Sequence, residues 1–275
     1  MDAASPTTST PADDDARPPR RWLRLSIIWH VTFFVLFVLP VAVSAALYAS
    51  SDHPRSFRDA NWSSTGLLPT AASDPDARVT VFAARNGTWR GIFATHTWIV
   101  VKPRGGAYTR YEVTGFGGPL RVNGSAPDSF WFSNVPEVIA DLRGKDAEAV
   151  VPKIIKAVES YPYRNYGDYR IWPGPNSNTF VATVMRAAPE LQGTLPPTAI
   201  GKDFRADGSV FGLTPSGTGV EIEIFGLFGI KVGWIEGIEF NLFTLVAGLD
   251  IRHPAVKLPG IGRIGFDKPP PAQIH

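Results

Sequence analysis

Two residues whose types suit acyl transfer lie far apart in the sequence. His96 stands in Thr95-His-Thr-Trp-Ile-Val-Val, a run typical of a β-strand, and strand alternation places His96 and Trp98 on one face. Ser177 follows the loop-forming run Trp172-Pro-Gly-Pro-Asn and begins a segment with helical apolar spacing. A helix N-terminus presents backbone N–H groups that stabilise an oxyanion. These patterns predict Ser177 as a nucleophile and His96 as its general base.

A serine hydroxyl stays protonated near neutral pH, so this chemistry also needs a group that orients the imidazole. Glu112, on a predicted strand over residues 107–114, is the best acidic candidate, although it can instead pair with Arg110. Asn176 and Asn178 are candidate polar donors to the oxyanion. A structural interpretation stays open for the same residues, in which Ser177 caps the helix and His96 is a buried histidine bound to a carbonyl.

Aromatic residues gather before the candidate serine. Tyr169 and Trp172, with Trp98 on the histidine strand, can line a binding groove or belong to ordinary packing. The chain has no cysteine, so thiol nucleophiles and thiolate metal sites are excluded. Asp203, Asp207 and Asp250 lack metal-ligand spacing, and no dinucleotide or phosphate-binding glycine motif is present, so we expect no metal and no cofactor.

Two family resemblances add to this prediction. An H-x-x-I-x-V strand followed downstream by Asn176-Ser-Asn-Thr-Phe-Val resembles the circularly permuted papain-like proteins of the lecithin retinol acyltransferase and NlpC-like group, with serine in place of their cysteine. More segments, among them H-T-W-I-V-V-K-P, W-P-G-P-N-S-N-T-F-V and K-L-P-G-I-G-R-I-G, resemble the uncharacterised bacterial family of domain of unknown function 3750. The first resemblance implies a permuted papain-like α+β fold, and the second implies a bacterial membrane but no activity.

Residues Leu25 to Tyr48 predict a membrane span, because they form 24 residues without formal charge and about 20 suffice to cross the hydrocarbon core. Arginines 17, 20, 21 and 24 precede the span and favour a cytoplasmic N-terminus with the main domain outside the cytoplasm, in the periplasm of a Gram-negative cell. The alternative is a cleaved signal peptide, whose apolar region is usually shorter.

The remaining chain divides by composition. We expect a disordered cytoplasmic tail over 1–20, the anchor over 21–49, a linker over 50–77, a papain-like α+β domain over 78–200 and a β-rich region over 201–275. The expected strands are 79–84, 91–101, 107–114, 220–225 and 230–234, and the expected helices are 136–143, 146–160 and 176–188. The apolar stretch 237–251 carries charges and glycines, so we expect β-structure there, packed on the domain or close to the lipid surface.

Composition excludes one broad class of function. The chain has 275 residues, 44% of them hydrophobic, and a net charge of only +2, so it lacks the basic face that nucleic-acid binding needs. The sequence predicts a serine-dependent hydrolase or acyltransferase acting on an envelope amide or ester. The alternative is a noncatalytic envelope binding or scaffold protein on a degenerate papain-like fold. In either case, an envelope substrate or protein partner is expected but not identified.

Overall fold

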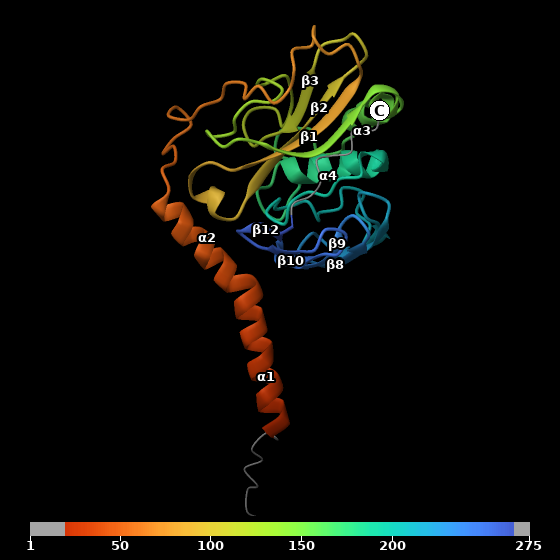
Figure 1. The fold of residues 1–275 in the computed structure, drawn as a ribbon. Helices are drawn as coiled ribbons and strands as arrows, with labels where there is room; N and C mark the ends of the chain where they lie inside the picture. Colours follow the sequence, from red (N-terminus) through yellow and green to blue (C-terminus); the bar gives the residue numbers. More distant parts are fainter. Residues whose placement is uncertain (1–19, 267–275) are drawn as a thin grey trace, which may run out of the picture.

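The computed structural model describes residues 20–266 and has a helical rod, a five-stranded sheet with two helices, and a seven-stranded sheet (Figure 1). The tail predicted over residues 1–20 falls, up to residue 19, outside the described part. The structure is mixed α and β, with an N-terminal apolar helix and a β-rich C-terminal region, as expected. The permuted papain-like arrangement stays a prediction.

The rod is one continuous helix formed by α1 (Arg20–Phe33), the π-helical η1 (Phe34–Val38) and α2 (Leu39–Ser50). Its residues Arg21–Ser50 are long and apolar enough to cross a membrane, as an anchor or a signal sequence would. The π-helical turn ends two residues before Pro40, which has no N–H to donate to the preceding turn.

The five-stranded sheet is antiparallel, in the order β4-β3-β2-β1-β5. Its strands are β1 (Arg78–Arg85), β2 (Thr95–Lys102), β3 (Thr109–Val113), β4 (Leu120–Val122) and β5 (Glu137–Arg143). The two central strands, β1 and β2, are buried on both faces and are rich in β-branched and aromatic residues.

One predicted element in this part was wrong, and another was predicted to begin too early. The short helix expected over 136–143 is strand β5, because pairing with β1 outweighs its local helix preference. Asp141 of β5 accepts hydrogen bonds from Arg78 Nε (2.7 Å) and Thr80 Oγ1 (2.8 Å) of β1, which fix this register. The strand expected from residue 91 begins at Thr95, since Thr88–Ile92 form a 3-10 turn (η2).

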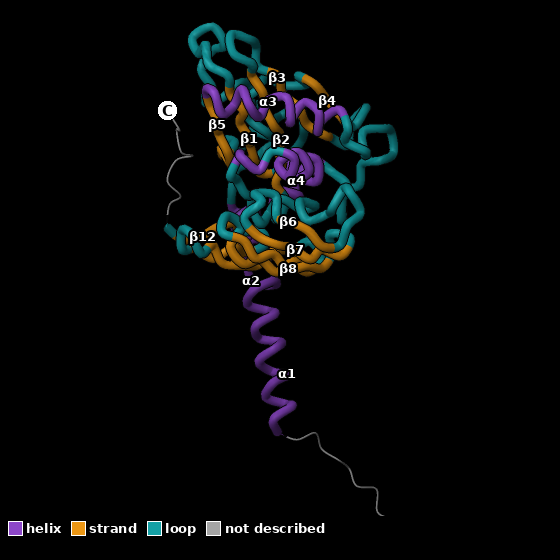
Figure 2. Tube along the Cα trace, turned by 90° about the vertical axis from the view of Figure 1, so that its right-hand side faces the viewer, coloured by secondary structure: helices purple, strands orange, loops and turns teal. Residues whose placement is uncertain are grey.

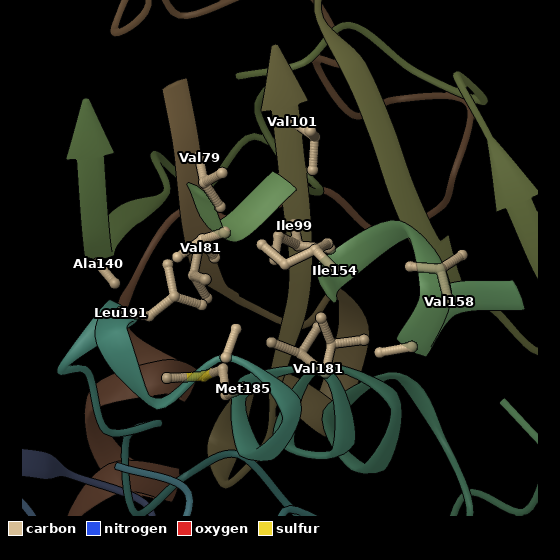
Figure 3. Packing of buried hydrophobic residues seen from close by; sticks show 14 of the residues in the cluster. Val79, Val81, Ile99, Val101, Ala140, Ile154, Val158, Val181, Met185 and Leu191 are labelled. Carbon is tan, nitrogen blue, oxygen red and sulfur yellow. The ribbon is translucent and has the colours of Figure 1, made fainter. Parts of the chain in front are cut away.

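Helices α3 (Gly144–Glu159) and α4 (Ser177–Ala187) cover one face of this sheet, at the positions that the sequence predicts. Figure 3 shows the core between them, where Val81 and Ile99 of the sheet meet Ile154 of α3 and Val181 of α4. α4 crosses β2, the strand that carries His96, so the fold brings the start of α4 to the end of the sheet.

The opposite face of the sheet carries an aromatic cluster. Phe82, Trp98 and Trp131 are buried there, and Trp62 packs edge-on against Trp131 with ring centroids 5.2 Å apart. Trp62 belongs to the segment over 50–77 for which the sequence suggested a linker. This segment therefore contributes to the packing of the domain.

The C-terminal region forms a seven-stranded antiparallel meander with neighbouring strands in chain order. The strands are β6 (Phe211–Leu213), β7 (Gly219–Ile224), β8 (Phe228–Gly233), β9 (Gly237–Leu242), β10 (Leu245–Asp250), β11 (Ala255–Leu258) and β12 (Gly262–Gly265). Figure 2 shows this sheet between the five-stranded part and α1.

Candidate functional site

A pocket of about 600 Å³ lies where the start of β2 meets the N-terminus of α4. His96 and Ser177 both line it. Other walls come from the loop before α4, the turn between β9 and β10, and Val41 of the long helix. The pocket therefore joins the two candidate catalytic residues to the helix that is able to span a membrane.

His96 is buried, and Glu112 holds its ring on one side. The Nε2 atom lies 2.9 Å from Glu112 Oε2, and the ring stacks on Trp131 with a centroid distance of 3.7 Å and an interplanar angle of 12°. Burial lowers the pKa of His96, and the Glu112 carboxylate opposes this only in part, so the ring is neutral near pH 7. Because Nε2 donates to the carboxylate, the unprotonated nitrogen is Nδ1.

Glu112 pairs with two groups through the same oxygen. Arg110 Nη2 lies 2.7 Å from Oε2, which also accepts from His96. Burial acts to raise the pKa of Glu112, but the hydrogen bonds and charges of its neighbours outweigh it and lower the pKa to about 2. Arg110 is itself held over the Trp98 ring, 4.1 Å from its centroid. Glu112 thus makes both of the contacts considered for it, a hydrogen bond with His96 and an ion pair with Arg110.

Ser177 is the first residue of α4, and its hydroxyl makes no hydrogen bond to any residue in the described part of the chain. The capping residue is Asn176, whose Oδ1 accepts from the N–H groups of Asn178 (2.9 Å) and Thr179 (3.3 Å). Hence the structure does not use the Ser177 hydroxyl as the cap. The Ser177 N–H has no acceptor within the helix, as is general for the first residues of a helix.

His96 and Ser177 share the pocket wall, but no hydrogen bond joins them among residues 20–266. Their side chains approach the pocket from different sides of β2. Thr97 faces α4 and donates to Asn178 Oδ1 (2.9 Å), whereas His96 lies with the aromatic cluster of the opposite face. The candidate nucleophile and the candidate base thus line one pocket from opposite faces of the sheet, without a hydrogen bond between them in the described part of the chain.

The two asparagines next to Ser177 bind the backbone of the domain. Asn178 Nδ2 donates to the carbonyls of Thr95 (2.9 Å) and Ile200 (2.7 Å). Asn176 Nδ2 donates to the carbonyls of Ile171 (3.1 Å) and Ile200 (3.0 Å). Both Nδ2 groups therefore already donate two hydrogen bonds to backbone carbonyls. The backbone N–H groups at the α4 N-terminus are then the candidate donors to an oxyanion.

The predicted aromatic residues divide into wall and core. Tyr169 and Trp172 line the pocket, and Trp172 Nε1 donates to the carbonyl of Phe243 (3.3 Å). Trp98 is buried beneath His96 and donates to the Pro127 carbonyl (2.8 Å), so it supports the site from the core. Sequence reasoning missed Trp131, which stacks on His96, and Phe243. The aromatic run at 130–132 was the only signal for Trp131.

Within residues 20–266, no group of three His, Asp or Glu side chains is placed to hold a metal ion.

Comparison with known proteins adds one match. No curated protein and no solved structure is significantly similar to the chain, so the papain-like resemblance has no support from them. A family model described as "Protein of unknown function (DUF3750)" matches residues 76–204. The match includes the five-stranded sheet, α3, α4, His96, Glu112 and Ser177. The central part of the chain is therefore similar to this family of proteins of unknown function.

Proposed function

We propose that this protein is a membrane-anchored serine hydrolase or acyltransferase, with Ser177 as nucleophile, His96 as general base and Glu112 as the positioning residue. One observation carries the proposal: two groups line the same pocket. One is the neutral imidazole of His96, which the Glu112 carboxylate holds, and the other is the Ser177 hydroxyl, which has no hydrogen-bond partner among the described residues. This combination of groups is the one that serine nucleophiles use.

In the proposed reaction, Ser177 Oγ attacks the acyl carbon while its proton passes to His96 Nδ1. The N-terminus of α4 stabilises the oxyanion, with the Ser177 N–H as the nearest donor. The acyl–leaving group bond then breaks, and the leaving group takes the proton from His96. Water or an alcohol attacks the acyl-enzyme in the second half, again with His96 as base. The missing Ser177–His96 contact has to form on substrate binding, as catalytic hydrogen bonds often do.

The pocket walls indicate the kind of acyl donor. Trp89, Phe93, Phe116 and Phe243 line the pocket together with Val41 of the long helix. Apolar and aromatic walls with few polar groups fit a hydrophobic chain. We therefore expect an envelope ester or amide that carries an acyl or other apolar chain.

The same proposal includes an uncleaved anchor, because the long helix packs into the folded domain. Ser44 Oγ donates to the carbonyls of Gly260 (3.0 Å) and Ile92, and a Cβ built on Gly260 would lie 3.2 Å from Val41. A signal peptide removed from the chain would leave these partners uncovered. With the arginines before the span inside the cell, the domain lies outside the cytoplasm.

The test uses the absence of cysteine from the chain. Ser177→Cys introduces a single thiol, and a poised site lowers its pKa so that it reacts with iodoacetamide much faster than Ser73→Cys, a thiol at an exposed loop position. Adding His96→Gln to Ser177→Cys should remove most of the acceleration, while the glutamine amide can still donate to Glu112. Equal rates for the thiols at 177 and 73, or no effect of His96→Gln, would refute the catalytic role.

A noncatalytic binding protein is the second candidate. Two observations favour it: His96 packs in the domain by stacking on Trp131, and no hydrogen bond joins Ser177 and His96 among the described residues. In this case the pocket binds the same apolar ligand class without reaction. Unaccelerated thiol chemistry together with retained ligand binding would establish it.

A further inference from the structure

The C-terminal sheet has its apolar face on the outside. Along β7, Val220, Ile222 and Ile224 are 47%, 46% and 45% exposed, whereas Glu221 and Glu223 between them are 1% and 2% exposed. The neighbouring strands repeat this pattern in register. We call the outward residues the apolar plate: Phe211, Leu213, Val220, Ile222, Ile224, Phe228, Ile230, Val232, Phe240, Leu249, Val256 and Ile264.

The inward face of the same sheet carries an ionic network. Lys231 Nζ lies 2.6 Å from Asp203 and 3.0 Å from Glu221, and Lys257 Nζ lies 2.5 Å from Glu239. Lys202 joins the two halves, since its Nζ bonds Asp203 (3.0 Å) and Glu239 (2.5 Å). The charged residues of these strands thus find partners inside the protein, and the plate itself contains no charged side chain.

This arrangement is the reverse of a sheet in water. An antiparallel sheet with one solvated face normally buries its apolar residues and exposes its polar ones. A contiguous apolar surface of this extent marks a contact with a membrane or a protein. The charged side chains are turned inward although burying ions carries a desolvation penalty. The outward apolar face is therefore suited to an apolar environment.

The position of the plate identifies that environment. Figures 1 and 2 show the seven-stranded sheet on the side of the globular part from which α1 extends, with α1 running away from it. The long helix passes directly beside the sheet, where η1 contacts β10 and Ser44 bonds Gly260. Trp234, in the turn between β8 and β9, is 57% exposed at the plate's edge, a position typical of aromatic residues at a membrane interface.

We propose that the apolar plate lies in the outer leaflet of the same bilayer that the long helix crosses, at the boundary between headgroups and acyl chains. The occupant is lipid, because the helix places the plate against the membrane surface and the plate offers no charge to a polar partner. The protein is then held by two elements, a span and an interfacial sheet. This inference requires the long helix to be an anchor, but it does not depend on catalysis at Ser177.

Site-specific fluorescence tests the proposal on the full chain, which has no native cysteine. Val232→Cys places a label on the plate, and Val122→Cys places it on β4, at a valine that is exposed (54%) but belongs to the other sheet. Each variant carries an environment-sensitive nitrobenzoxadiazole label in phosphatidylcholine vesicles, with and without phosphatidylglycerol. Quenchers are iodide on both sides of the vesicle and, separately, lipids with a spin label on the acyl chain.

The plate label should be blue-shifted, quenched by the spin-labelled lipid, and several-fold less sensitive to iodide than the label at 122. Phosphatidylglycerol should change neither result, since the plate is uncharged. Iodide quenching equal to that at 122 would show that the plate faces water. Protection from both quenchers would show that a protein, such as a second copy of the chain, covers it. Either of these outcomes overturns the proposal.

Discussion

Replacing Glu112 by glutamine removes the charge that holds His96 and Arg110 together in the site. The Glu112 side chain is 1% exposed, and its Oε2 lies 2.7 Å from Arg110 Nη2 and 2.9 Å from His96 Nε2. Removing one partner of a buried ion pair costs about 3–5 kcal/mol. Glutamine retains a carbonyl acceptor, and Arg110 keeps its bonds to Ala126 and Ser129. We therefore expect Glu112→Gln to lower the free energy of unfolding by about 3 kcal/mol at pH 7.

The pH dependence follows from the lowered pKa of Glu112. Its value of about 2 in the folded protein lies below the ordinary value of 4.5. The carboxylate thus stabilises the fold fully above pH 4.5, and this stability is lost as the pH falls toward 2. The difference between wild type and Glu112→Gln should shrink over the same range, because the protonated carboxyl and the amide are both neutral.

The assay is urea unfolding in detergent micelles, followed by the fluorescence of tryptophans such as Trp98 and Trp131, which are buried near the site. Glu148→Gln is the matched control, since Glu148 pairs with Arg104 at 3.4 Å on the surface and should contribute about 0–1 kcal/mol. Two results would refute the reasoning. One is a loss in free energy of unfolding below about 1 kcal/mol for Glu112→Gln, equal to that of the control. The other is a loss that stays constant down to pH 3.

Three further predictions concern other parts of the chain. Burial and the nearby Asp203 raise the pKa of Glu223 to about 8. The wild-type protein should therefore lose stability as the pH rises from 4.5 to 8. In Glu223→Gln the melting temperature should depend less on pH over that range. Asn176→Ala removes the α4 cap and two donors to backbone carbonyls. In the same urea assay it should lower the free energy of unfolding by about 2 kcal/mol or more. The control Asn165→Ala, at an exposed position, should lower it by at most about 0.5 kcal/mol. If the anchor is uncleaved, mass spectrometry of the membrane fraction after a carbonate wash should find the original N-terminus; a mature chain that begins near residue 47 would contradict this.

Local patterns predicted the strands and helices that carry the site, because the apolar periodicity of these segments matches the faces that the fold buries. The β-branched run around His96 and the apolar spacing after Ser177 each specify one structure. The segment 136–143 has helix-forming residues, yet it becomes an edge strand through the non-local bonds between Asp141 and β1. The residues of this segment alone do not predict its pairing with β1.

The site itself was only partly predictable. Alternation placed Glu112 and Arg110 on one face of a predicted strand, and Glu112 was the acidic candidate for orienting His96. The pattern did not show that His96 faces the same side of the sheet, which follows from the pairing of β2 with β3. Trp131 reaches His96 from a distant loop, and Phe243 reaches the pocket from the C-terminal sheet, so both depend on the tertiary fold.

The C-terminal sheet shows a limit of pattern analysis. The alternation Val220-Glu-Ile-Glu-Ile predicts an amphipathic strand, which is present, but the pattern does not say which face is turned inward. In water the valine and isoleucines would be buried, whereas here the glutamates are. The inversion depends on the basic residues of neighbouring strands and loops, and on the position of the sheet beside the long helix.

Labelling with a serine-directed fluorophosphonate probe tests the central claim most directly. The wild-type protein in detergent or vesicles should be labelled at Ser177, as located by mass spectrometry of the modified peptide. Ser177→Ala should abolish the label and His96→Gln should slow it strongly, whereas Ser73→Ala should leave it unchanged. No labelling of the folded wild-type protein, or labelling that persists in Ser177→Ala, would contradict the claim that Ser177 is a nucleophile activated by His96.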